Sequence, residues 1–298
     1  MANLLIGVMI LLYTFQSAFA NLFARHYAGK KAYSSAVYSV IYGVLVSLGT
    51  FVFSGLSFHP SGTTLILGAV NGAALVAYNT LLIRAASLGP FSVTMIFNLS
   101  GGILIPMLWS VFHDGDRLSV WQVIAIFVML VSFVLLNWED KKESEGEKKP
   151  GVSLPFLITI TALGCVNGLY GTLMNTAEKL ADGKENGEMI IVTFAVSALI
   201  GFVLLLLRAK GDTLPALRLN GKSALFALLA SFSACAAVNL LMHVLSLVNV
   251  AVLYSMDNGG VLIVSVLWSA LVLKEKIGGK KVVGLILSIA AVFALSIL

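Results

Sequence analysis

The chain has 298 residues, of which 59% are hydrophobic and only 11% are charged, and its mean hydropathy is +0.97. Soluble domains carry about 25% charged residues, so this composition excludes a soluble domain and indicates an integral membrane protein. The net charge of +5 does not indicate nucleic-acid binding, because basic residues in membrane proteins mostly set orientation.

Ten apolar segments follow one another along the chain, and each is predicted to be a helix because backbone groups in hydrocarbon must be satisfied within their own segment. Most match the roughly 20 residues that cross a bilayer. The first has no basic n-region and no cleavage site before it, so it is predicted to be a retained span. The segments are 4–24, 33–56, 62–87, 91–112, 118–138, 153–178, 188–207, 222–246, 250–273 and 279–297.

The two halves of the chain are predicted to be repeats. An offset of 159 positions places 240–269 on 81–110 with eight identities, including Gly260 on Gly101 and the Trp268-Ser269 pair on Trp109-Ser110. Five spans are an odd number, so the second copy enters the membrane in the opposite sense, as in the inverted repeats of secondary transporters. The fold is therefore predicted to be all-α, with ten transmembrane helices: residues 1–138 form the first five-helix repeat, 139–152 a charged cytoplasmic linker and 153–298 the second repeat.

Orientation is predicted from Lys and Arg. Of the 19 such residues, only Arg117, Lys179 and Lys184 fall outside the loops that follow odd-numbered spans. The positive-inside rule places those odd loops in the cytoplasm. We therefore expect a multi-pass protein of the cell membrane with both termini outside and a cytoplasmic central loop.

The end of the ninth span reads Leu-Val-Leu-Lys-Glu-Lys-Ile from Leu271 to Ile277, and Val-Gly-Leu-Ile-Leu follows from Val283 to Leu287. This Leu-x-Glu turn and glycine-bearing helix resemble the drug/metabolite transporter superfamily in its ten-span EamA-type branch. In the first half Asp116 takes the place of the glutamate and Ala125 that of the glycine. The resemblance implies this architecture for the whole chain, without a substrate. It also implies cytoplasmic termini, whereas the charge count predicts termini outside.

Asp257 is the only acid deep inside a predicted span. A carboxylate at such depth is costly unless it is neutralised or faces a polar cavity, which makes it a functional-site hypothesis. Its repeat mate is Asn98, and Tyr254, Asn258 and Asp257 share one helix face. Asp257 is predicted to exchange a proton or to hold a cationic group of the substrate, and the alternative is a structural acid bonded to a neighbouring helix.

Amide and tyrosine stripes on other spans predict the remainder of a cavity, although polar stripes also hold helices together. His243 is a second candidate for proton coupling, as a proton relay. The alternative is a structural role, which is commoner for a lone histidine in a helix. Gly284, Ser288 and Ala291 form a small-residue face on the last span that is suited to a homodimer. The predicted substrate-binding residues are Tyr13, Gln16, Tyr78, Asn79, Asn98, Asn167, Tyr170, Asn175, Asn239, Tyr254, Asp257 and Asn258.

The leading hypothesis is a secondary active transporter that moves a small organic metabolite or drug by alternating access, with protons coupled through Asp257. An aromatic and amide lining suits a polar or weakly cationic molecule better than a polyanion. The alternatives are a structural or receptor-like membrane protein, or an intramembrane enzyme that uses Asp257 and His243. The expected partners are the substrate, protons and the lipid bilayer. No catalytic residue, metal, cofactor or nucleic acid is expected.

Overall fold

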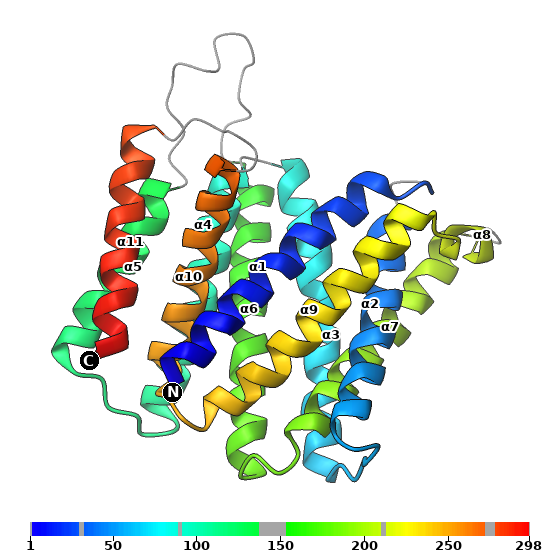
Figure 1. Ribbon diagram of the computed structural model, residues 1–298, viewed down its shortest axis with the longest axis horizontal. Coiled ribbons are helices and arrows are strands. Elements are labelled where there is room, and N and C mark those ends of the chain that lie inside the picture. Colours follow the sequence, from blue (N-terminus) through cyan, green and yellow to red (C-terminus); the bar gives the residue numbers. More distant parts are fainter. Residues whose placement is uncertain are drawn as a thin grey trace. The chain divides into compact units, whose positions relative to one another are not determined.

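The computed structural model describes residues 2–29, 33–88, 91–136, 153–209, 213–271 and 278–297, and within these ranges the regular structure is α-helical throughout (Figure 1). The all-α class is confirmed, and each predicted segment matches a helix whose ends differ by a few residues. The short helix α8 was not predicted. The helices are α1 (Ala2–His26), α2 (Ser34–Phe53), α3 (Gly62–Leu88), α4 (Phe91–Phe112), α5 (Val120–Leu136), α6 (Leu154–Leu180), α7 (Asn186–Ala209), α8 (Thr213–Leu217), α9 (Gly221–Leu245), α10 (Val250–Leu271) and α11 (Gly279–Ile297).

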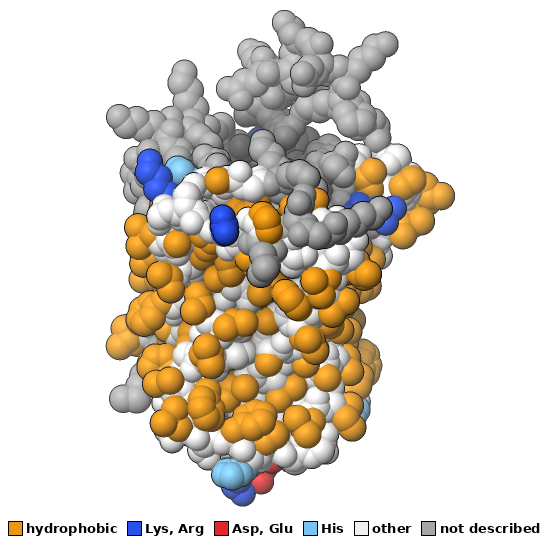
Figure 2. Space-filling view, turned by 90° about the vertical axis from the view of Figure 1, so that its right-hand side faces the viewer, with side chains coloured by type: hydrophobic (Ala, Val, Ile, Leu, Met, Phe, Trp, Pro, Cys, Tyr) orange, Lys and Arg blue, Asp and Glu red, His pale blue; other side chains and the backbone are white. Residues whose placement is uncertain are grey.

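Six helices within the described residues are long and apolar enough to span a membrane, namely α1, α2, α3, α6, α7 and α9. Shorter apolar stretches lie in α4, α5, α10 and α11. In Figure 2 hydrophobic side chains cover the middle of the visible face, while blue and red charged side chains lie toward its two ends. This pattern is expected where hydrocarbon covers the middle of a helix and water covers its ends.

The described chain divides into two compact units that do not follow the expected halves. Unit 1 combines Thr80–Thr172 with Val248–Leu298, and unit 2 combines Ala2–Asn79 with Leu173–Leu247. Each unit therefore takes helices from both halves of the sequence. The predicted linker at 139–152 lies outside the described residues, as do residues 272–277 of the Leu271–Ile277 motif.

In unit 2, α1 packs along α9 and α2 packs along α7 (Figure 1). The apolar core at one end of these helices includes Phe23, Val37 and Leu205. Close approach of α2 to α7 depends on Gly43, because an added Cβ there would lie 2.6 Å from the carbonyl oxygen of Phe194.

In unit 1, α5 packs along α11, and α10 contacts α4, α5 and α11. The small-residue face of α11 is used inside the chain, which corrects its predicted role at a dimer interface. Ser288 is fully buried, and its hydroxyl lies 3.3 Å from Sδ of Met129 on α5. A sequence stripe of small residues predicts that another helix packs there, but it does not say whether that helix belongs to the same chain.

Candidate functional site

The candidate site is centred on Asp257, which lies seven residues after the first residue of α10. At 1.5 Å per residue this places it about 10 Å along the helix. One carboxylate oxygen, Oδ1, is buried and has no hydrogen-bond partner within the described part of the chain. Buried polar atoms are almost always hydrogen-bonded, so an exception calls for an explanation. This oxygen is a natural position for a proton or a ligand donor.

Two tyrosines accompany Asp257. The Tyr254 hydroxyl donates to the backbone carbonyl of Gly171 on α6 at 2.9 Å, which fixes one turn of α10 against α6. Tyr170 and Asp257 both lie close enough to the Tyr254 hydroxyl to interact with it electrostatically. Three predicted site residues from two helices thus belong to one cluster.

Three asparagines extend the cluster toward α4. The Asn167 side chain on α6 donates to the backbone carbonyl of Asn98 at 2.9 Å. The Asn258 side chain donates to the carbonyl of Tyr254 at 2.8 Å. The amides of Asn167 and Asn258 both lie over Gly102 of α4, where an added Cβ would be 2.6 Å from Asn167 Nδ2 and 3.2 Å from Asn258 Oδ1.

Glycines explain why α4 and α6 come close enough to join this cluster. An added Cβ at Gly101 would meet the backbone of Gly164, and one at Gly168 would lie 2.5 Å from the carbonyl oxygen of Gly101. Gly164 and Gly168 are four residues apart and share one face of α6, so they form the small-xxx-small pattern that lets membrane helices approach closely. The sequence pattern drew attention to Gly101 through its repeat mate Gly260, but it gave no sign of the glycines on α6 that Gly101 packs against.

The six residues of this Asp257 cluster are Asn98, Asn167, Tyr170, Tyr254, Asp257 and Asn258, and all belong to unit 1. They provide one carboxylate, three amides and two phenols, with no histidine and no thiol. This set can hydrogen-bond a polar molecule and hold one exchangeable proton, but it lacks a paired acid and base. Within the described residues no group of three or more His, Cys, Asp or Glu side chains lies together as a metal site.

The other seven predicted residues belong to unit 2, and the structure gives each a separate setting. Asn239 donates to the Thr50 hydroxyl at 2.9 Å and to the Cys235 carbonyl at 2.8 Å. Gln16 donates to the Tyr42 hydroxyl at 3.2 Å. Sequence reasoning singled out neither Tyr42 nor Thr50, although the Tyr38–Tyr42 spacing of four residues was a signal that could have been followed. Those two rings stack at 5.1 Å.

His243 lies exposed in the last turn of α9, a position that does not resemble the buried setting of Asp257. Asn175 is almost fully buried. Tyr13, Tyr78 and Asn79 are partly buried. The predicted proton-coupling residues are thus divided between the units, with Asp257 in unit 1 and His243 in unit 2.

Two groups outside the spans have shifted pKa values, both in unit 2. Burial, followed by the effect of Tyr33, raises the pKa of the Tyr27 hydroxyl above its ordinary value of 10.0. That hydroxyl donates to the Ala216 carbonyl at 2.7 Å, so it ties α8 to the end of α1. Hydrogen bonds from Thr64 and then from Ser61 lower the pKa of the Glu185 carboxyl below 4.5.

Comparison with known proteins gives information about the fold alone. No family model and no curated protein matches the chain. A solved structure described only as "Crystal structure of protein" is similar to it, with a TM-score of 0.75 and 15% sequence identity. The match covers 99% of this chain and 97% of that chain. At this identity the likeness shows a shared fold and carries no information about activity.

Proposed function

We propose that the chain is a secondary active transporter of a small polar organic molecule, with ten spans and proton coupling through Asp257. The observation that carries the proposal is the buried Oδ1 of Asp257, which has no partner within the described residues. An ionised carboxylate left in this state costs several kcal/mol. Binding a proton or a cationic substrate group removes that cost, so occupancy by one or the other alternates through a transport cycle.

The packing of the helices supports an inverted repeat. The predicted repeat pairs each helix of the first half with an equivalent helix of the second half. Three of these equivalent pairs are in contact: α2 with α7, α4 with α10, and α5 with α11. Asn98 and Asp257 lie at the same distance from the starts of their helices, seven residues after Phe91 and Val250 respectively. A pseudo-twofold relation of this kind supports access from both sides of a membrane, which a purely structural protein does not need.

The composition of the cluster favours transport over intramembrane catalysis. General acid–base chemistry needs a positioned acid and base around the reacting atoms. The Asp257 cluster supplies one carboxylate, and the histidine that the enzyme alternative invoked is exposed in the last turn of α9. One titratable group among amides and phenols suits binding and release.

Ligand-driven proton flux tests the proposal. A panel of amino acids, organic cations and nucleosides is first screened for compounds that raise the melting temperature of the purified protein, because a ligand that binds the native state stabilises it. Each stabilising compound is then added to proteoliposomes that contain a pH-sensitive dye. We expect the wild-type protein to couple uptake of at least one compound to proton movement, and Asp257→Asn to reduce this flux to the level of protein-free vesicles.

Asp182→Asn is the matched control. It makes the same chemical change in the α6–α7 turn, where the Asp182 side chain is 83% exposed and the backbone φ is 48°. Asparagine tolerates this left-handed conformation as well as aspartate does. The control should retain wild-type flux. Undiminished proton-coupled flux in Asp257→Asn would reject the coupling role.

A further inference from the structure

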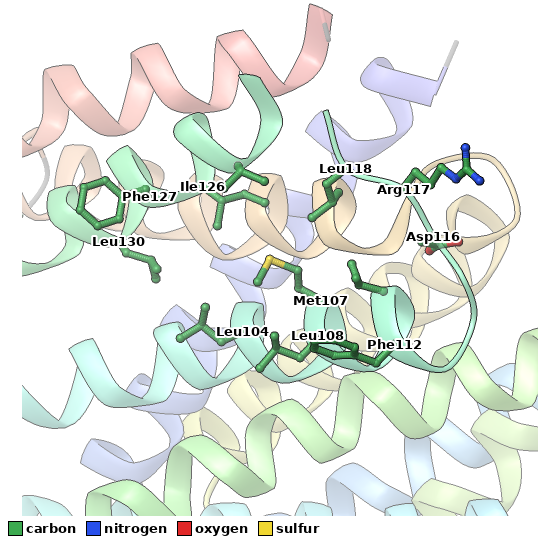
Figure 3. A pocket seen from close by; sticks show the side chains of 12 residues that line it. Leu104, Met107, Leu108, Phe112, Asp116, Arg117, Leu118, Ile126, Phe127 and Leu130 are labelled. Atoms are coloured by element: carbon green, nitrogen blue, oxygen red, sulfur yellow. The ribbon is translucent and has the colours of Figure 1, made fainter. Parts of the chain in front are cut away.

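A cleft lies between α4 and α5, wholly inside unit 1 (Figure 3). Its volume is about 660 Å³, within the range of about 300–1,000 Å³ that is typical of ligand pockets. None of its lining residues belongs to the predicted transport site. The cleft is therefore a separate feature that the proposed function does not use.

The cleft exists because the α4–α5 hairpin is open. Helices joined by a short connection normally pack as antiparallel neighbours, but here α4 packs mainly on α10 and α5 packs mainly on α11. The two helices of the hairpin touch only slightly. Their facing sides are consequently only partly covered, and Leu108 on α4 and Phe127 on α5 are 47% and 66% exposed.

The walls of the cleft are two apolar stripes. Leu104, Leu108 and Val111 follow i, i+4, i+7 on α4, and Val123, Phe127 and Leu130 follow the same spacing on α5. Figure 3 shows Leu104 and Leu108 across the cleft from Phe127 and Leu130. The stripe on α4 extends from Leu104 to Phe112 and is about 12 Å long at 1.5 Å per residue. Such a slot accommodates part of a hydrocarbon chain.

The rim is charged at the loop end, where Asp116 and Arg117 lie beside Leu118 (Figure 3). Arg117 is exposed, and its guanidinium makes no hydrogen bond or ion pair within the part of the chain that the structure describes. Lys184, by comparison, lies 3.9 Å from Asp182. An unpaired guanidinium at the end of an apolar slot is complementary to an anionic head group attached to a hydrocarbon chain.

We propose that the α4–α5 cleft binds an anionic glycerophospholipid, with one acyl chain between the two stripes and its phosphate at Arg117. The apolar slot selects an amphiphile over a small polar metabolite. Asp116 on the same rim already interacts within the chain, so Arg117 is the rim charge open to a head group, and it favours an anionic head group over a zwitterionic one. This inference rests on the membrane placement in the proposed function and does not depend on transport.

Photo-crosslinking tests the site. The full chain is reconstituted in phosphatidylcholine vesicles that contain phosphatidylglycerol with a diazirine in one acyl chain, and labelled peptides are mapped by mass spectrometry. We expect label on the α4 and α5 stripes in excess of that on the exposed apolar face of α7, which includes Phe202 and Leu206. Arg117→Gln should reduce the excess about fivefold, the factor expected for one basic residue near anionic lipid.

Three further variants keep the test decisive. Arg117→Lys keeps the charge and should retain the label, while Arg208→Gln alters an exposed arginine in the last turn of α7 and should change nothing. Leu108→Trp narrows the slot without touching Arg117 and should also reduce labelling. Size-exclusion chromatography confirms that each variant is folded.

Three results would overturn the proposal. The first is equal labelling of the cleft and the α7 face, and the second is equal labelling by a diazirine phosphatidylcholine. The third is an interchain disulfide formed by Phe127→Cys in a Cys165→Ser background, because it would show that a second copy of the chain occupies the cleft. Asp257-dependent proton flux that persists alongside any of these would reject the lipid site alone.

Discussion

The α4–α5 and α10–α11 hairpins are predicted repeat mates, yet the structure builds them differently. The helices α10 and α11 pack along each other, whereas α4 and α5 diverge and leave the cleft between them. Helix α10 packs on α4, α5 and α11 and is hydrogen-bonded to α6 through Tyr254, and it carries the carboxylate. Helix α4 carries the neutral mate, Asn98. The comparison shows that the hairpin with the charged helix is closed, whereas the hairpin with the neutral Asn98 keeps an open side.

The largest expected effect comes from exchanging the two mates. Asn98→Asp combined with Asp257→Asn moves the carboxylate from α10 to α4 at the same distance from the helix start. We expect the exchanged protein to show no proton-coupled flux in dye-loaded vesicles, because Asn98 is packed against α6 through the Asn167 bond and α4 lacks the surroundings of α10. Recovered flux would mean that the two mates are interchangeable and that the asymmetry has no functional role.

Two glycine substitutions compare how tightly α4 and α10 are held. An added methyl at Gly101 meets the Gly164 backbone, whereas one at Gly259 meets the end of the Met129 side chain at 2.5 Å. Backbone cannot move aside as a flexible methionine can. We expect Gly101→Ala to cost about 1–3 kcal/mol, the usual cost of overpacking, and Gly259→Ala to cost less.

Thermal unfolding in detergent measures this difference, and Gly7→Ala on α1 is the control. An added Cβ at Gly7 has no heavy atom within 4 Å, so its melting temperature should not fall. A larger loss for Gly259→Ala than for Gly101→Ala would show that α10 is held more rigidly than α4, against the contacts seen here.

The closed α5–α11 contact and the open face of α5 allow a further comparison. Ser288 is fully buried against α5, whereas Val123 is 51% exposed in the cleft. We expect Ser288→Leu to lower stability by about 1–3 kcal/mol because it overpacks a closed contact. Val123→Leu should stay within about 0.5 kcal/mol, as surface substitutions do. Equal melting temperatures for the two variants would indicate that α11 does not pack on α5 as described.

The sequence predicted the positions of the helices better than it predicted which helices pack against each other. Hydrophobic runs predicted the helices because a span must be apolar along its whole length. The packing partner of each helix was harder to predict, because periodicity identifies the face that is buried and does not identify the element that covers it. The small-residue face around Ser288 was therefore assigned to a dimer, although it packs on α5.

The site was predicted in part for the same reason. Asp257, Tyr254 and Asn258 share one helix, so spacing alone grouped them. The contact between Asn167 and Asn98 is 69 residues apart in sequence and depends on backbone approach at Gly164 and Gly168. No local pattern gives that pairing. The division of the polar stripes between two units could likewise not be predicted by considering one span at a time.

The smallest expected effect concerns two loops that are joined by hydrogen bonds, in contrast to the exposed Arg117 at the rim of the cleft. The backbone N–H of Ser61 donates to Glu185 Oε2 at 2.9 Å, and the Ser61 hydroxyl accepts from the N–H of Thr64 at 3.2 Å. The Glu185 carboxylate thus lies at the N-terminus of α3, where negative charge is favourable. It joins the α6–α7 turn to the α2–α3 loop.

The pH dependence follows from the lowered pKa of Glu185. A carboxyl whose pKa is lower in the folded state stabilises the fold above its unfolded pKa, and this contribution is lost as the pH falls through the folded value. Wild-type protein should therefore melt slightly above Glu185→Gln at neutral pH, and the gap should close as the pH falls below about 4.5. A gap that stays constant across this range would mean that the charge at α3 contributes nothing and that the difference arises from hydrogen bonds that the protonated Glu185 keeps and the glutamine does not.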